Sequence, residues 1–175
     1  MTEAQLSNAM DAYGSTVYRL ALTRMQNIAD AEDVYQEVFL RLWKQAAEDW
    51  DGDRAKAWLI RTTLNRCADL HRFRLRRPVL SFAEIPDLAQ PEDESRELWE
   101  AVNRLPEKAR TAVHLYYAEG YSAEEISQLM HIPAATVRTR LHRARKQLKE
   151  LLGGIDDETC VSRSDGTNFG PQRAE

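Results

Sequence analysis

The placement of proline is the feature that most limits what this chain can fold into. A proline inside a helix removes one backbone hydrogen bond and collides with the preceding turn, so it ends or kinks the helix. The sequence has six prolines in 175 residues, and three of them, Pro78, Pro86 and Pro91, fall within one acidic stretch. No helix is expected to cross that stretch, which is therefore predicted to divide the chain into two parts.

The predicted fold class is all-α, with two small helical domains joined by a flexible linker. We expect the first domain at about residues 1–77, the linker at 78–95 and the second domain at 96–153. The first domain lacks strand-like alternation of useful length, which favours helices over a sheet. The remaining tail, residues 154–175, is polar and without periodicity, so we expect it to be disordered.

Three helices are predicted in the first domain. Apolar residues recur at helical spacing in the first of them, at Leu6, Met10, Tyr13, Val17 and Leu20. Asp30 stands where the N-cap of the second helix is expected, and that helix should end near Gln45. The third helix is expected to begin at Asp53 and to continue to about Arg76.

The second domain has clearer helix boundaries. Pro106 suits the first turn of a helix, where its missing N–H has no partner to lose, and Gly120 is expected to end that helix. Ser122 and Glu125 form the capping-box pattern S-x-x-E at the start of a short helix. After a tight turn, Pro133 begins a long final helix. This arrangement predicts a helix-turn-helix.

The final helix has one apolar side and one basic side. Its apolar stripe, Val137, Leu141, Ala144 and Leu148, should face the preceding helices. The segment 138–149 contains six Lys and Arg residues and no acidic residue. Such a helix fits the major groove of duplex DNA, although a solvated basic face on a plain helical bundle is the simpler alternative. The residues predicted to contact DNA are Ala135, Thr136, Arg138, Thr139, His142, Arg143 and Lys146.

The second helix of the first domain has two distinct faces. Its broad apolar side is formed by Ala31, Val34, Val38, Phe39, Leu42 and Trp43. Its other side mixes charged and polar residues with one leucine, and consists of Asp33, Gln36, Glu37, Leu40 and Lys44. A leucine within a charged stripe is typical of a helix that docks on a partner, but it also occurs by chance on solvated faces. The pattern alone leaves both interpretations open.

The third helix divides in the same way. One side groups Leu59, Ile60, Thr63, Leu64, Cys67 and Leu70, and is expected to be buried. The other side carries Trp58, Arg61, Asn65, Asp69, Arg72 and Arg76. A tryptophan with arginines along one face suits nucleic acid, since the ring can stack on a base and the arginines can meet phosphates. An arginine face whose aliphatic stems cover apolar surface is equally consistent with this pattern.

Composition excludes several functional classes. The formal net charge of −4 argues against a protein that coats nucleic acid indiscriminately, so DNA binding would depend on local basic stripes. No glycine-rich phosphate loop, zinc-protease motif or nucleophile elbow is present, and we expect no catalytic residue, metal or cofactor. The two cysteines, Cys67 and Cys160, form neither a disulfide framework nor a metal motif. Without a signal peptide or membrane span, the expected location is the cytoplasm.

Taken together, three segments resemble the sigma factors of bacterial RNA polymerase, in the small extracytoplasmic-function (ECF) group. The resemblance covers about residues 10–152. DAEDVYQEVFLRLW resembles the family's region 2 helix that docks on core polymerase, and AWLIRTTLNRCADLHR resembles the segment that opens and reads the minus-10 element. LPEKARTAVHLYYAEGYSAEEISQLMHIPAATVRTRLHRARKQL resembles region 4, which reads the minus-35 element. Family members often have glycine where this chain has Ala135, which affects the geometry of the helix start more than its role.

This resemblance implies a function and assigns roles to the faces described above. The chain would bind core RNA polymerase, recognise a two-part promoter and help to melt its minus-10 side, and an anti-sigma factor would regulate it. The residues implied in polymerase binding are Asp33, Gln36, Glu37 and Leu40, and those implied in minus-10 binding are Trp58, Arg61, Asn65, Arg72 and Arg76. The final helix would read the minus-35 element. The alternative is a conventional helix-turn-helix regulator that binds DNA as a dimer, which would not explain the region 2 resemblance.

Overall fold

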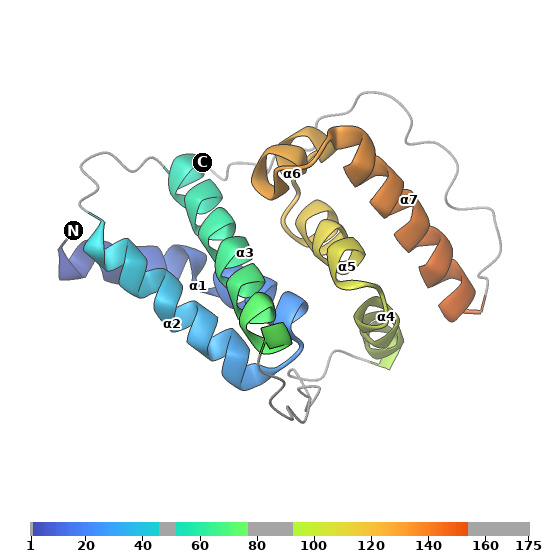
Figure 1. Ribbon diagram of the computed structural model, residues 1–175, viewed down its shortest axis with the longest axis horizontal. Helices are drawn as coiled ribbons and strands as arrows, with labels where there is room; N and C mark the ends of the chain where they lie inside the picture. The colour runs from blue at the N-terminus through green and yellow to red at the C-terminus, as the bar shows by residue number, and fades with distance from the viewer. Residues whose placement is uncertain (1, 46–51, 77–92, 154–175) are drawn as a thin grey trace.

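The computed structural model describes residues 2–45, 52–76 and 93–153. Within these ranges the chain is helical and contains no strand, which confirms the predicted fold class (Figure 1). The helices are α1 (Glu3–Met25), α2 (Ile28–Lys44), α3 (Gly52–Arg76), α4 (Asp93–Asn103), α5 (Glu107–Val113), the π-helical turn η1 (His114–Ala118), α6 (Ala123–Met130) and α7 (Ala134–Leu151). The expected tail and most of the expected linker lie outside the described residues, and α4 begins inside the range assigned to that linker.

The N-terminal half, α1–α3, forms a three-helix layer in which α1 packs on both α2 and α3. Thr2 begins α1 with a capping box, because its hydroxyl accepts from the Gln5 N–H and the Gln5 side chain accepts from the Thr2 N–H. Its core consists of apolar residues that recur at helical spacing, among them Val17, Ala21, Val34, Val38, Leu42, Leu59 and Cys67. Burying these side chains is the main stabilisation of this half.

Two details of α2 differ from the sequence prediction. Asn27, not Asp30, is the N-cap: it has extended backbone, and its side chain accepts from the Asp30 N–H at 3.0 Å. Both residue types cap helices well, so the sequence could not choose between them. Asp30 instead lies buried in the first turn, where its carboxylate pairs with Arg74 of α3. Trp43, assigned to the apolar side, is 43% exposed because it lies at the edge of that side.

The C-terminal half, α4–α7, follows the predicted helix boundaries closely. Gly120 has a φ of +76°, the left-handed conformation that suits glycine where a helix ends. Ser122 and Glu125 form the predicted capping box at the start of α6. The sequence analysis did not assign α4, and it predicted one regular helix from Pro106, whereas the last five residues of that helix adopt π geometry.

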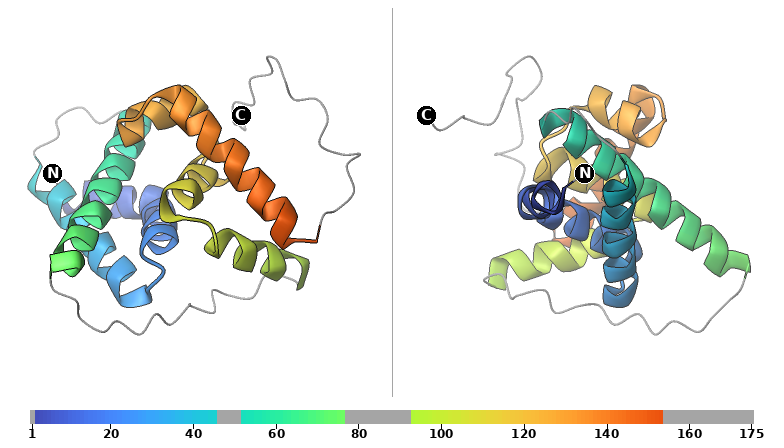
Figure 2. Two further views of the ribbon diagram at one scale, coloured as in Figure 1. Left: turned by 45° about the vertical axis from the view of Figure 1, so that its right-hand side comes forward. Right: turned by 90° about the vertical axis from the view of Figure 1, so that its left-hand side faces the viewer.

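The two halves are packed against each other, which the sequence did not predict. Leu20 of α1 and Ile60 and Leu64 of α3 are buried within the core of the C-terminal half, where that core includes Leu115 and Ile126. In both Figure 1 and Figure 2, α5 lies between the N-terminal half and α7. The position of α7 relative to α3 is therefore set through α5 and α6.

Arg110 of α5 is the polar centre of this contact. Its guanidinium is buried and donates to three backbone carbonyls: Thr23 at 2.5 Å, Asn103 at 3.0 Å and Leu105 at 2.9 Å. The first two carbonyls belong to the last turns of α1 and α4, where a helix leaves its carbonyl groups without internal partners. One side chain thus satisfies the ends of two helices, one from each half. Gln26 adds a bond to the Asn103 carbonyl at 2.7 Å.

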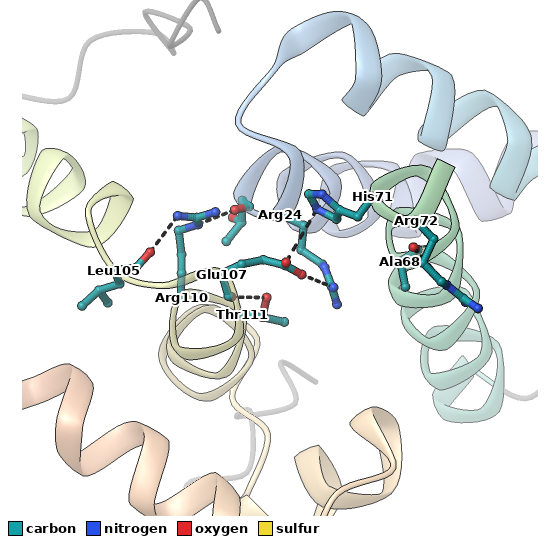
Figure 3. A network of polar contacts seen from close by, with 9 residues as sticks. Arg24, Ala68, His71, Arg72, Leu105, Glu107, Arg110 and Thr111 are labelled. Carbon is teal, nitrogen blue, oxygen red and sulfur yellow. Dashed lines mark hydrogen bonds and ion pairs between the residues drawn. The ribbon is translucent and has the colours of Figure 1, made fainter. Parts of the chain in front are cut away.

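Two acidic residues of the C-terminal half also bind basic residues of the N-terminal half. Glu107 pairs with Arg24 and lies 3.8 Å from His71 Nε2, and Figure 3 shows its carboxylate reaching toward both side chains. Glu119 receives the Lys56 ammonium at 2.9 Å and the Thr16 hydroxyl at 3.2 Å. Each half therefore supplies charges that complement those of the other.

His114 lies buried in the same contact. Its Nδ1 is 3.3 Å from the Thr23 hydroxyl, and its Nε2 is 3.8 Å from the Glu119 carboxylate. Burial lowers the pKa of His114 below its ordinary value of 6.5, against the opposing effect of Glu119 and with a smaller contribution from Arg19. The imidazole is therefore neutral near pH 7.

The hydrogen bonds of Arg110 predict how much its removal lowers the free energy of unfolding. Arg110→Ala should lower the free energy of unfolding by about 3 kcal/mol, because the Thr23 and Leu105 carbonyls lose the donor that Arg110 supplies. Arg104→Ala, an exposed arginine six residues away, is the matched control and should change stability by less than about 0.5 kcal/mol. Urea denaturation followed by circular dichroism measures both changes. Equal effects of the two substitutions would contradict the role given to Arg110.

The lowered pKa of His114 predicts a pH dependence. Folding favours the neutral imidazole, so this stabilisation is complete above pH 6.5 and is lost as the pH falls through 6.5 and below. Between pH 7.5 and pH 5, wild type should lose more unfolding free energy than His114→Gln does. His71, which lies near Glu107, is unchanged in both proteins and cancels in the comparison. Parallel pH profiles would show that His114 contributes nothing to the dependence.

Candidate nucleic-acid and partner interfaces

A tight turn sets the angle between α6 and α7. His131 ends α6 in the left-handed conformation, with a φ of 53°, and the Ile132 N–H donates to the Ser127 carbonyl at 3.1 Å. The Ser127 hydroxyl in turn donates to the Ile132 carbonyl at 2.6 Å. Pro133 then serves as the N-cap of α7. These bonds fix the short loop, so the orientation of α7 on α6 is well defined.

The faces of α7 agree with the predicted pattern. Val137, Leu141 and Ala144 are buried against the rest of the C-terminal half, and Leu148 is half-buried. Of the residues predicted to contact DNA, all but one are exposed; Thr136 is half-buried, and the exposed ones are Ala135, Arg138, Thr139, His142, Arg143 and Lys146. The structure thus brings the predicted DNA-contacting residues together on one outward face of α7.

Two contacts around α7 were not foreseen. Arg138 pairs with Glu124 of α6, and Arg145 Nε donates to the Tyr117 hydroxyl at 2.9 Å. The Glu124 and Arg138 side chains are both about 60% exposed, so their pairing orients the guanidinium but contributes little stability. Glu124 lies in the first turn of α6, within the capping-box motif. This position was the one sequence signal that could have indicated a contact with α7.

The mixed stripe of α2 lies on the surface of the N-terminal half. Asp33, Gln36 and Leu40 are exposed, and Glu37 is half-buried. Glu37 accepts from Arg41 Nε at 2.9 Å, and this hydrogen bond is the main cause that lowers the pKa of its carboxyl group. These four residues therefore form an outward-facing stripe with two acidic side chains.

An exposed apolar pair interrupts this charged stripe. Leu40 is 53% exposed and Trp43 is 43% exposed, and a spacing of three residues places them on the same side of the helix. Sequence reasoning placed Leu40 on the mixed stripe but placed Trp43 on the broad apolar side of the helix. Large apolar side chains that stand together among charges mark a surface that a partner can cover.

An open groove adjoins this stripe between α1 and α2. It has a volume of about 430 Å³ and is lined by Gly14, Ser15, Tyr18, Glu32, Tyr35 and Gln36. Gly14 permits the close approach of the helices, since a Cβ there would lie 3.0 Å from the Tyr35 hydroxyl oxygen. The groove was not predicted, because it depends on how α1 and α2 cross.

The predicted nucleic-acid face of α3 is only partly free. Arg61, Asn65 and Arg72 are exposed, and Arg72 Nη2 donates to Asp69 at 2.8 Å. Trp58 is half-buried and packs against the core of the N-terminal half, so its ring is not a freely projecting platform. The side chain of Arg76 lies outside the described residues.

The described residues were compared with the geometry that a metal site requires. No group of three His, Cys, Asp or Glu side chains gathers there in a way that could hold a metal ion. Burial raises the pKa of the Cys67 thiol to about 12, which makes it a poor nucleophile. In the same ranges, no helix combines the length and the apolar character that a membrane crossing requires.

Comparison with known families accounts for both halves. The family model for sigma-70 region 2 matches residues 9–77, and that for sigma-70 region 4 matches residues 95–148. The ECF RNA polymerase sigma factor SigM of Bacillus subtilis is 31% identical over 155 residues, which cover 83% of this chain and 94% of SigM. The chain belongs to the ECF sigma factors. Its family consists of transcription initiation factors, and the region 2 match is what a conventional dimeric regulator would not explain.

Other relatives of this sigma factor differ in length. SigE of Mycolicibacterium smegmatis is 34% identical over 161 residues, which cover 86% of this chain but only 62% of SigE. The ECF sigma-E factor of Haemophilus influenzae is 31% identical over 150 residues, which cover 75% of this chain and 79% of that relative.

Solved structures share the fold of this sigma factor. The sigma factor RpoE of Bartonella quintana, solved in complex with the anti-sigma factor NepR, matches with a TM-score of 0.71 at 25% identity, over 85% of this chain and 97% of that chain. CnrH, solved in complex with the cytosolic domain of CnrY, matches with a TM-score of 0.61 at 25% identity, over 89% of this chain and 92% of that chain. The overall arrangement of this sigma factor thus resembles that of these two proteins.

Proposed function

We propose that this sigma factor binds core RNA polymerase and directs it to promoters that carry minus-10 and minus-35 elements. The observation that carries this proposal is the presence of two unlike surfaces in one chain. One is the acidic stripe of α2, with its exposed leucine and tryptophan, and the other is the basic outer face of α7. The first suits a protein partner and the second suits DNA.

The α2 surface is the proposed contact with core polymerase. It is formed by Asp33, Gln36, Glu37 and Leu40, and we add Trp43 because the structure exposes it. An amphipathic helix that presents apolar side chains within charged residues fits against a helical partner surface. The negative charge of the stripe would orient it toward a basic partner face.

The outer faces of α3 and α7 are the proposed contacts with the promoter. Residues near the start of α7, including Arg138 and His142, would reach base edges of the minus-35 element, whereas Lys146 would meet phosphates. Arg61 and Asn65 of α3 are exposed and would contact the minus-10 element together with Arg72 and Arg76. Trp58 would have to leave its packed position before it could stack on an unpaired base.

An anti-sigma factor is the proposed regulator. The sigma factor RpoE, which shares the arrangement of this chain, was solved bound to the anti-sigma factor NepR, and CnrH was solved bound to the cytosolic domain of CnrY. We propose that a protein of the same functional class binds this sigma factor. The proposed target of this sigma factor is the transcription machinery, so its proposed location is the cytoplasm.

Substitutions on α7 test base reading. Arg138→Ala or His142→Ala should weaken binding to the minus-35 element by roughly 1–3 kcal/mol if the side chain makes a specific base contact. Lys146→Ala should weaken binding to all sequences and reduce the slope of log affinity against log salt by about one unit. Fluorescence anisotropy with promoter and scrambled duplexes measures both. If the arginine and histidine substitutions affect the two duplexes equally, these residues do not read bases.

A double substitution on α2 tests polymerase binding. Glu37→Lys combined with Leu40→Ala should abolish capture by purified core polymerase and all promoter-directed transcription. Both side chains lie on the surface, so the melting temperature should change little. DNA binding by α7 should persist, because that helix belongs to the other half.

Glu3→Lys combined with Leu98→Ala is the matched control, since it reverses one exposed charge and truncates one exposed leucine elsewhere. The control protein should bind core polymerase as wild type does. Undiminished capture of the folded α2 variant would remove the assignment of this surface. A wild type that core polymerase does not capture would remove the proposed function itself.

A further inference from the structure

We propose that Glu124 determines how selectively α7 reads DNA: its carboxylate holds the Arg138 guanidinium ready for a guanine edge and away from phosphates. This role rests on the proposed function, in which the outer face of α7 enters the major groove. Glu124 belongs to α6 and lies outside the set of residues predicted to contact DNA. Because it acts on DNA only through Arg138, Glu124 is a positioning residue.

The packing of α6 on α7 fixes where the two side chains stand. Ile126 of α6 and Val137 of α7 are fully buried in one core, so the two helices cannot rotate independently. Glu124 lies in the first turn of α6, and Arg138 lies near the start of α7. Figure 1 shows that the start of α7 lies beside α6. The fold therefore brings the acidic residue and the arginine together before any DNA is bound.

The pair uses one corner of the guanidinium. Arg138 Nη2 donates to Glu124 Oε1, and a guanidinium carries five N–H donors in one plane. A guanine edge needs two parallel donors, for its O6 and N7 atoms. One bond to Glu124 therefore fixes the plane of the guanidinium and leaves enough donors for a guanine. An arginine without such a partner must be ordered when DNA binds, which costs side-chain entropy.

The negative charge of Glu124 also acts on the other target that DNA offers to Arg138. An arginine beside a duplex can bind phosphate oxygens, and such contacts carry no sequence information. The first helix of a helix-turn-helix crosses the DNA backbone, so a carboxylate on α6 repels the phosphates that come near it. A guanine edge presents neutral acceptors and is repelled less. Glu124 should therefore disfavour the phosphate contact of Arg138 more than its base contact.

The exposure of the pair sets the size of this effect. Both side chains are 60% exposed, and an exposed ion pair shifts an equilibrium by up to about fivefold. Such a shift changes folding little, but it acts directly on the ratio of guanine-bound to phosphate-bound Arg138. Loss of Glu124 should therefore lower the preference for the best DNA sequence over unrelated DNA by about fivefold.

Binding measurements with the full-length protein test this role. The wild type first selects its preferred sequence from a pool of short duplexes with a randomised centre, and the affinity for that duplex is compared with the affinity for a scrambled duplex. In Glu124→Ala the ratio of the two affinities should fall about fivefold. On the scrambled duplex, the slope of log affinity against log salt should steepen by about one unit, because Arg138 gains a phosphate contact.

Two further variants separate this role from a general effect of charge. Glu97→Ala removes an exposed acidic residue of α4 and should leave the ratio of affinities unchanged. Glu124→Ala in an Arg138→Ala background should not lower the ratio further, since no guanidinium remains to be held. All variants should melt as the wild type does, because the substituted side chains are exposed. In the free protein, the NMR order parameter of the Arg138 Nε–H should fall in Glu124→Ala.

The results that would overturn the proposal differ from those that would overturn the proposed function. If the wild type discriminates and Glu124→Ala discriminates equally well, Glu124 does not set selectivity. An equal fall in the ratio with and without Arg138 would show that Glu124 contacts DNA itself. An unchanged order parameter would show that Glu124 does not hold the guanidinium. A wild type that selects no sequence would instead remove base reading by α7 from the proposed function, and this role of Glu124 with it.

Discussion

The buried guanidinium of Arg110 is the interaction on which the rest of this structure depends. A helix ends with carbonyl groups that lack partners, and two such ends, from α1 and α4, meet beside α5. Only a side chain with several donors in a rigid plane can satisfy carbonyls that point at it from different elements, and arginine has that geometry. Because α7 packs on α5, fixing α5 against α1 also fixes the proposed DNA-binding face of α7 relative to the N-terminal half.

The function proposed for this sigma factor depends on two surfaces that lie on different helices. An overall charge of −4 would disfavour DNA binding if the charge were evenly spread. Instead, α7 concentrates six basic residues between positions 138 and 149, while α2 presents acidic residues beside Leu40 and Trp43. The α3 helix has three different faces, which contact the core of the N-terminal half, the C-terminal half and solvent.

Sequence reasoning was most accurate where local rules determine the structure. The capping box of Ser122 and Glu125, the ending of a helix before Gly120 and the buried stripe of α7 follow from hydrogen-bond needs and from periodicity. It was wrong where two residues met the same local rule, as with Asp30 and Asn27, or where a residue stood at the edge of a stripe, as with Trp43. The roles of the exposed stripes on α2 and α3 came from the family resemblance, since their patterns alone fit two interpretations.

The sequence by itself determined every helix except α4, most of the buried faces, the helix-turn-helix and the family. Tertiary structure alone decided that the two halves pack together, that Asp30 pairs with Arg74, and that a groove opens between α1 and α2. From their spacing, Ile60 and Leu64 are expected to belong to the core of the N-terminal half. Nothing in that spacing indicates that they enter the core of the C-terminal half. The physical reason is that periodicity shows which residues of a helix are buried, but it does not show which distant segment of the chain covers them.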